Sequence, residues 1–313
     1  MATVDVSIPK REIPKPSAGA GAWGWLAPFL LSTVGTKLTV AVTGLMLIGF
    51  VYFHMIGNLQ IYAGLTFSND PATVREATRH GQEILNRYAE FLKSEELLLW
   101  MARGGLLAVF LLHLVLTLRL RWLNAKARPV RYVYEKTIQA TWASRHMALT
   151  GIVIGLFVLF HLAHYTLGVV KPAEVVVAGY YDPYLESPVV APVEYRGQMV
   201  HPGDRVAVHY LDLRDYRGRH DVYTMATYGF GQNWQGYTIS IIYIAAMIAL
   251  FFHLRHGIHS VLQTLGIAHR KLYSTFALIA LVLAAVVAIG NISMPLAIML
   301  GLIRPGEVYL PAA

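Results

Sequence analysis

The chain has 313 residues, of which 56% are hydrophobic and only 14% charged, and its net charge is +8. This composition is far from that of an ordinary soluble domain and is typical of a protein with several membrane-spanning segments. The chain contains no cysteine, which excludes disulfides, thiolate-held iron–sulfur clusters and covalently attached haem within it.

Five stretches are apolar over the roughly 20 residues that a helix needs to cross a bilayer. They are residues 33–57, 97–120, 147–170, 237–259 and 273–302. The sequence therefore predicts an all-α membrane protein, a bundle of five transmembrane helices. Residues 1–28, rich in Pro, Lys and Gly, are expected to form a flexible cytoplasmic segment. Residues 29–313 would form the membrane domain, with 171–236 as an extracytoplasmic insertion.

Two polar segments between the spans have their own local patterns. Asp70 and Pro71 suit the N-cap and first position of a helix, so we expect a short amphipathic helix along the outer surface there. The insertion between spans three and four contains the alternating stretch DRVAVHYLDL, which predicts short strands and turns outside the membrane. The sequence shows no evident internal repeat.

The charges are distributed unevenly along the chain. The segment between spans two and three carries many Lys and Arg residues against the single acid Glu135, whereas the loops after spans one and three are net acidic. By the positive-inside rule, the N-terminus is cytoplasmic and the C-terminus lies outside, which five spans satisfy. We expect a multi-pass protein of a bacterial cytoplasmic membrane, with the lipid bilayer rather than nucleic acid as the partner of its basic residues.

Histidine is the informative residue type in these spans, because an imidazole is costly to bury in lipid and usually faces protein, a cavity or a cofactor. Spans one to four carry His54, His113, His161 and His253. At 1.5 Å per residue, His113 and His253 lie roughly 12 and 10 Å from the inner ends of their helices. His161 lies roughly 22 Å from its inner end, and His54 lies at least as far out. The sequence thus predicts an inner and an outer pair.

Two imidazoles at one depth on different helices can hold one iron from both faces of a porphyrin. The pairs therefore predict two haem b groups with both axial positions filled, which suits electron transfer rather than oxygen binding. The alternative without a metal is that each histidine only forms hydrogen bonds between helices. Three other histidines compete for the ligand positions: His164, His256 and His259.

The haem carboxylates need cationic or hydrogen-bonding partners near the inner membrane surface. The candidates are Lys37, Trp142, Arg145 and Arg255. Each of them is equally well explained as an anchor at the basic membrane interface.

Four stretches together resemble a known family. They are KLTVAVTGLMLIGFVYFHMIGNLQIY, YAEFLKSEELLLWMARGGLLAVFLLHL, SRHMALTGIVIGLFVLFHLAHYTLG and DVYTMATYGFGQNWQGYTISIIYIAAMIALFFHLRHGIHSVLQTLG, which cover spans one to four. They resemble the membrane cytochrome b subunit of succinate:quinone oxidoreductases and fumarate reductases, in its single-chain, five-helix, di-haem form. The resemblance implies that His54 and His161 hold the outer haem, and His113 and His253 the inner one.

The resemblance also implies partners and a role. A flavoprotein subunit and an iron–sulfur subunit would dock on the cytoplasmic face, and this chain would anchor them and pass their electrons to a quinone, typically menaquinone. Two features depart from the family. Phe251 stands where some fumarate reductases have a proton-carrying glutamate, and the segment 171–236 is longer than expected.

Other functions remain open from the sequence. The di-haem subunit of a nitrate reductase or formate dehydrogenase would share the haems but have another soluble partner. A histidine-lined transporter or a structural anchor would carry no haem. The direction of catalysis, the quinone site and any higher oligomer are also open.

Overall fold

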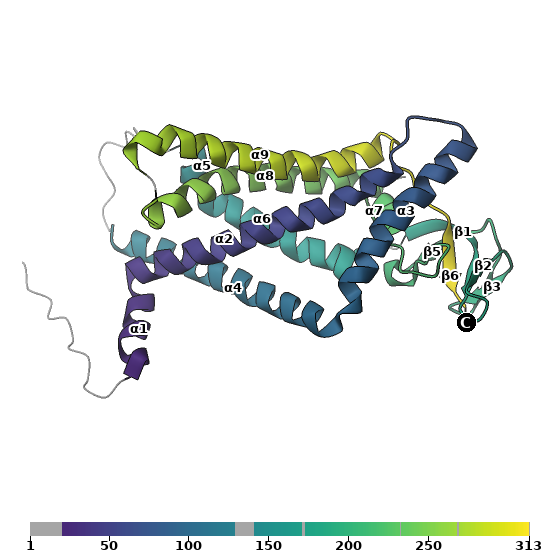
Figure 1. Ribbon diagram of the computed structural model, residues 1–313, viewed down its shortest axis with the longest axis horizontal. Helices are drawn as coiled ribbons and strands as arrows, with labels where there is room; N and C mark the ends of the chain where they lie inside the picture. The colour runs from purple at the N-terminus through teal and green to yellow at the C-terminus, as the bar shows by residue number, and fades with distance from the viewer. Residues whose placement is uncertain (1–20, 129–140, 171–172, 232, 268, 313) are drawn as a thin grey trace, which may run out of the picture.

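The computed structural model of the chain describes residues 21–128, 141–170, 173–231, 233–267 and 269–312 (Figure 1). Five of its helical segments are long and apolar enough to cross a membrane, which confirms the prediction of a multi-pass membrane protein. They are Thr33–Gly64, Glu96–Lys126, Met147–Thr166, Trp234–Thr264 and Tyr273–Met299. The first 20 residues and residues 129–140, where parts of the predicted cytoplasmic segments fall, lie outside the described residues.

The spans correspond to the helices α2 (Thr33–Asn58), α4 (Glu96–Lys126), α6 (Met147–His161), α8 (Trp234–Thr264) and α9 (Tyr273–Met299). α2 continues as a 3-10 turn over Leu59–Gly64, and α6 as a π-helical turn over Leu162–Thr166. Two short helices, α1 (Gly21–Leu31) and α5 (Trp142–Arg145), precede α2 and α6. Side-chain caps start α2 and α8: Ser32 accepts a hydrogen bond from the amide of Gly35, and Asn233 from that of Gly236, both at 3.0 Å.

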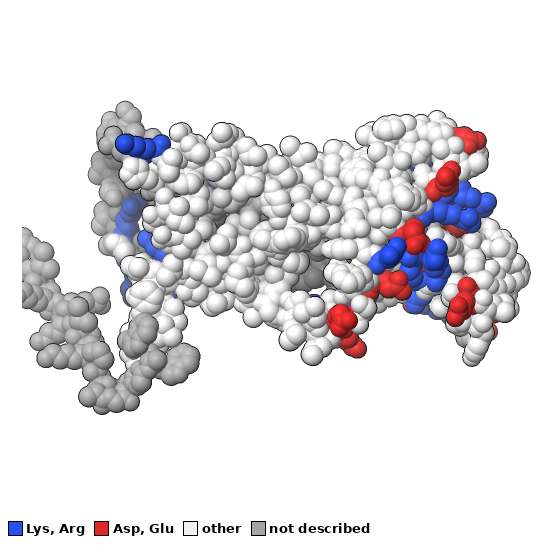
Figure 2. Space-filling model, in the orientation of Figure 1, with Lys and Arg blue, Asp and Glu red and all other residues white. Residues whose placement is uncertain are grey.

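The helix α8 lies at the centre of the bundle and packs against α2, α6 and α9. Its residues Leu250 and Leu254 share a buried core with Ala280, Ala284 and Val287 of α9. In contrast, α4 packs mainly on α2, and none of its residues, all of which are described, is buried. In Figure 2 a hollow opens between the start of α4 and the rest of the molecule. The bundle is therefore dense around α8 and open beside α4.

Charged side chains gather at the two ends of the molecule and leave the middle band apolar (Figure 2). Every Asp and Glu that the structure describes lies in residues 70–96, in residues 174–221 or at position 307, all at one end. The opposite end displays Lys and Arg on the face shown. Lys and Arg side chains also lie at the acidic end, Arg75, Arg79 and Arg217 among them, so the residues confined to one end are the described Asp and Glu residues.

The acidic end is a small β-containing body, so the prediction of an all-α protein is too simple. Strands form in the insertion, as predicted: β1 (Ala173–Asp182), β2 (Ser187–Val189), β3 (Val193–Tyr195), β4 (Gln198–Val200) and β5 (Arg205–Val208). β1 pairs antiparallel with β2 and β5, and β3 pairs with β4. The C-terminal strand β6 (Val308–Pro311), which was not predicted, pairs in parallel with β1. The chain end thus belongs to the same body as the insertion.

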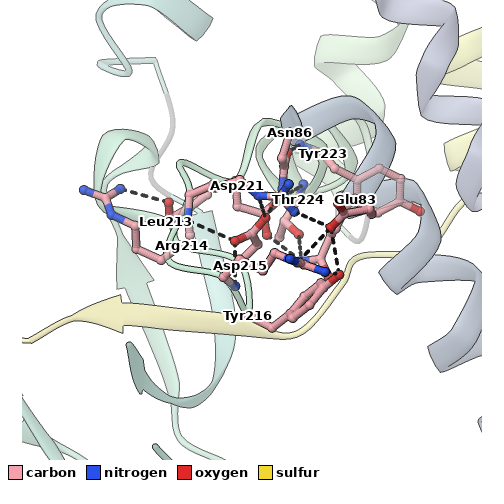
Figure 3. A network of polar contacts seen from close by, with 12 residues as sticks. Glu83, Asn86, Leu213, Arg214, Asp215, Tyr216, Asp221, Tyr223 and Thr224 are labelled. Carbon is pink, nitrogen blue, oxygen red and sulfur yellow. Dashed lines mark hydrogen bonds and ion pairs between the residues drawn. The ribbon is translucent and has the colours of Figure 1, made fainter. Parts of the chain in front are cut away.

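The helix α3 (Pro71–Ser94) begins as predicted, with Asp70 accepting a hydrogen bond from the amide of Thr73 at 2.9 Å. However, it is longer than the short helix that the sequence predicted. It is 24 residues long and buries polar residues, Gln82 and Asn86, against the segment that precedes α7 (Val222–Phe230). Figure 3 shows this polar contact, in which α3 joins the insertion to the bundle.

Candidate functional site

The outer histidine pair lies between α2 and α6. The rings of His54 and His161 stand edge to face, with their centres 5.9 Å apart and their planes at 86°. α2 packs mainly on α4 and α8, and α6 mainly on α8, so these two imidazoles approach each other from helices that are not closely packed together.

A tyrosine of α8 orients one member of this pair. The hydroxyl of Tyr243 lies 3.1 Å from Nδ1 of His161 and 3.0 Å from Nδ1 of His164. His164 is fully buried, and its other nitrogen lies 3.4 Å from the hydroxyl of Tyr210, which belongs to the β-containing body. Both nitrogens of His164 are therefore engaged by phenols. In His161 the phenol engages Nδ1, and Nε2 is the nitrogen that would face a metal.

The inner histidines are His113 of α4 and His253 of α8, and each contacts a threonine of a neighbouring helix. Nδ1 of His113 lies 3.1 Å from Oγ1 of Thr43 on α2, and Nδ1 of His253 lies 3.3 Å from Oγ1 of Thr150 on α6. Each imidazole is thus held on its Nδ1 side by a neighbouring helix.

Glycines make room for both inner imidazoles. A Cβ atom added to Gly44 would lie 3.2 Å from Cε1 of His113, and one added to Gly151 would lie 3.4 Å from Cε1 of His253. These glycines directly follow the two threonines in sequence. A Thr-Gly pair on one helix therefore seats the histidine of the next helix at both places.

The two pairs lie at two levels of the bundle. Thr43 and His54 are eleven residues apart on α2, and Thr150 and His161 are eleven residues apart on the helix α6. At 1.5 Å per residue this spacing is about 16 Å along the helix. The structure therefore brings His54 and His161 together and places His113 and His253 beside the two threonines one level further in.

The residues present fit a bis-histidine haem at the outer level. Ring centres of two imidazoles that share one iron should be about 6 Å apart, because each metal–nitrogen bond is about 2 Å long and each ring centre lies about 1 Å further out. The observed 5.9 Å agrees with this requirement. None of the four histidines is fully buried: His54 is exposed and the other three are half-buried.

The candidate carboxylate partners all lie toward the basic end. Lys37, Arg145 and Arg255 are exposed. Trp142 is also exposed, stacks on His146 at 4.3 Å between ring centres, and meets Phe252 edge to face at 4.8 Å. Phe252 directly precedes His253, so Trp142 contacts the helix α8 next to an inner histidine.

Sequence reasoning missed four residues of this site: Tyr243, Tyr210, Thr43 and Thr150. Tyr243, Thr43 and Thr150 each place a hydroxyl group inside an apolar span, which could have identified them as polar partners of the histidines. Tyr210 lies in the insertion, and its sequence position gave no such signal. Among the described residues, no group of three or more His, Asp or Glu side chains could hold a metal ion.

Comparison of the chain with protein-family models, with curated proteins and with solved structures finds no match. The fold and the site therefore define the chain at the level of a multi-pass membrane protein with paired intramembrane histidines.

Proposed function

We propose that this chain is the membrane anchor and electron-transfer subunit of a succinate:quinone oxidoreductase or fumarate reductase, and that it binds two haem b groups. The observation that carries the proposal is the approach of His54 and His161 from two different spans, at the 5.9 Å spacing that a shared iron requires. The matched placement of His113 and His253 one level further in supports a second site of the same kind.

The chain's own residues would hold and orient the two groups. Four imidazoles from four helices would supply the axial bonds, and hydroxyl groups on neighbouring helices would fix the orientation of three of them. Lys37, Trp142, Arg145 and Arg255 are the proposed partners of the inner carboxylates. When bound, the haems supply one-electron carriers at two levels of the membrane.

The basic end would face the cytoplasm and receive the iron–sulfur subunit, which in turn carries the flavoprotein subunit. The chain has no cysteine, which is consistent with iron–sulfur clusters residing on another chain. The proposed acceptor is a quinone, with menaquinone the form that the resemblance implies. The dehydrogenase chemistry itself would belong to the partner subunits, in a bacterial cytoplasmic membrane.

The proposal is tested by purifying the tagged chain from its native membrane and adding succinate to the oxidised complex. We expect an iron–sulfur and a flavoprotein subunit to copurify, and succinate to reduce the haem. Haem that is reduced by formate and not by succinate would assign the chain to another respiratory complex. A preparation without haem absorption would favour a transporter or a structural anchor and would overturn the proposal.

A further inference from the structure

We infer that Thr43 and Thr150 are matched positioning residues that fix the tautomer of His113 and His253 and thereby lower the redox potential of the inner haem. The inference rests on the proposed function, because it assigns a role toward a haem that those two histidines would hold.

The direction of the hydrogen bonds follows from the number of protons available. The Thr43 hydroxyl has one proton, and it donates to the carbonyl of Thr39 at 2.8 Å, with that of Val40 at 3.1 Å. The hydroxyl of Thr150 likewise donates to the carbonyl of Met147 at 3.0 Å, with that of His146 at 3.3 Å. Since a hydroxyl has a single proton, each oxygen is left to accept a hydrogen bond from the histidine beside it, which also donates to a backbone carbonyl, that of Val40 for His113 and that of Met147 for His253.

The histidines must then carry their proton on Nδ1. An imidazole protonated on Nδ1 presents the lone pair of Nε2, which is the form that binds a metal. His113 and His253 would therefore be prepared for ligation before any haem arrives. Gly44 and Gly151, whose Cβ positions lie 3.2 and 3.4 Å from the two imidazoles, allow each threonine helix to come this close.

The two arrangements belong to a short repeat that inspection of the sequence had missed. The stretches VTGLMLIGFVYFH, residues 42–54, and LTGIVIGLFVLFH, residues 149–161, have Thr, Gly, Phe, Val, Phe and His at equivalent positions. In both, the first shared phenylalanine packs on the final histidine: Phe50 on His54 at 5.4 Å and Phe157 on His161 at 5.8 Å. Each stretch thus supplies one outer ligand and seats one inner ligand.

The repeat favours a role of the two threonines toward the histidines over a role in helix packing alone. A threonine that only satisfied its own helix would need no particular partner on the next helix. Here each threonine stands eleven residues before an outer ligand in the sequence. Each also lies within hydrogen-bond distance of Nδ1 of an inner ligand. A hydrogen bond accepted from Nδ1–H makes the imidazole a stronger donor to iron, which stabilises the ferric state and lowers the potential.

The test is a potentiometric titration of the purified complex carrying Thr43→Val, Thr150→Val or both, because valine keeps the shape and removes the hydroxyl. A separate His54→Ala variant, which lacks an outer ligand, shows which of the two measured potentials belongs to the inner haem. We expect its midpoint potential to rise in each single variant and further in the double variant, while the outer haem keeps its potential. Thr43→Ser and Thr150→Ser should keep the wild-type potentials.

The matched controls are Thr39→Val and Thr117→Val. These hydroxyls donate to helix carbonyls, of Gly35 at 3.0 Å and Leu114 at 2.8 Å, and belong to the same two-helix pair. They should leave both potentials unchanged. Two bound haems with unaltered potentials in the valine variants would overturn the inference and leave the proposed function intact. If the valine variants lose the inner haem, serine variants that lose it equally would also overturn it. A wild-type chain that binds no haem would refute the proposed function itself.

Discussion

Asn86 of α3 donates through Nδ2 to two buried carboxylates, to Asp221 at 2.9 Å and to Asp215 at 3.1 Å. Its Oδ1 accepts the backbone amide of Tyr223 at 3.0 Å. Both aspartates and Asn86 itself are almost completely buried (Figure 3). Burial raises the pKa of Asp221, against the opposing effect of the hydrogen bonds from Thr224 and Asn86. The side-chain amide of Asn86 therefore joins α3 to the β-containing body.

Replacing Asn86 by Leu should strongly destabilise that body. The variant would leave two carboxylates short of a donor and one buried amide without an acceptor, at a cost of about 2–4 kcal/mol. Hydrogen exchange of the β1 amides in the whole purified protein measures this cost as a lower free energy of opening. The control is Asn69→Leu, since Asn69 accepts one exposed hydrogen bond from Arg304. It should cost less than about 1 kcal/mol. Equal effects of the two substitutions would contradict this account of the contact.

His220 should make the same body sensitive to mild acid. Its Nε2–H donates to the carbonyl of Tyr210 at 3.1 Å, and Nδ1 accepts from Lys93 at 2.9 Å. Burial and the neighbouring Lys93 lower the pKa of His220 to about 4. Between about pH 6.5 and 4 the unfolded chain thus binds a proton that the folded chain does not. The stabilisation is complete above pH 6.5 and is lost as the pH falls toward 4.

Thermal unfolding followed by intrinsic fluorescence tests this prediction. The unfolding temperature should fall from pH 7 to pH 5 in the wild type and fall less in His220→Asn, which cannot be protonated. His201→Asn is the matched control, because His201 is exposed and its Nδ1 lies 3.6 Å from Oδ2 of Asp204. A pH profile that His201→Asn flattens and His220→Asn does not would refute the assignment.

The competition between His161 and His164 has a direct test in haem content. His164 is fully buried with a phenol at each nitrogen, whereas His161 faces His54. His161→Ala should therefore reduce the haem per chain from two to one, and His164→Gln should retain two. The opposite outcome, with haem lost only in His164→Gln, would transfer the ligand role to His164.

The glycines beside the inner pair should be sensitive to added bulk. Valine at Gly44 or Gly151 would place methyl groups beyond Cβ positions that already lie 3.2 and 3.4 Å from an imidazole. We expect loss of the inner haem and retention of the outer one, measured by haem quantification. Ile152→Phe adds bulk next to Gly151 at a side chain that is 52% exposed. It should leave both haems in place, and a loss as large as that of the valine variants would contradict the steric account.

The parts of the fold that depend on residues close together in the sequence were predictable, and those that depend on distant residues were not. The five spans were predicted because long apolar runs have no stable alternative to a membrane helix. The start of α3 was predicted because Asp70 caps it through the amide of Thr73, three residues away. Strand β6 was not, because its partner β1 lies more than a hundred residues earlier in the chain. The buried polar face of α3 was also missed, since Gln82 and Asn86 look like solvent-facing residues until Asp221 is placed beside them.

The candidate site follows the same rule. The two histidine levels were predictable because helix rise converts sequence position into depth. Thr43 and Thr150 were not recognised, because a threonine in a span usually bonds to its own helix, which both also do. Their second contact, to an imidazole on another helix, became visible only when the helices were placed side by side.

The central claim is that imidazoles from four spans meet in two pairs and that each pair holds one haem. The most direct measurement is the haem content of the purified chain, by pyridine haemochrome assay against protein mass, with low-spin signals counted by electron paramagnetic resonance. The account predicts two b-type haems per chain, both low-spin with two imidazole ligands. A single haem per chain, or a high-spin iron with an open coordination position, would contradict it.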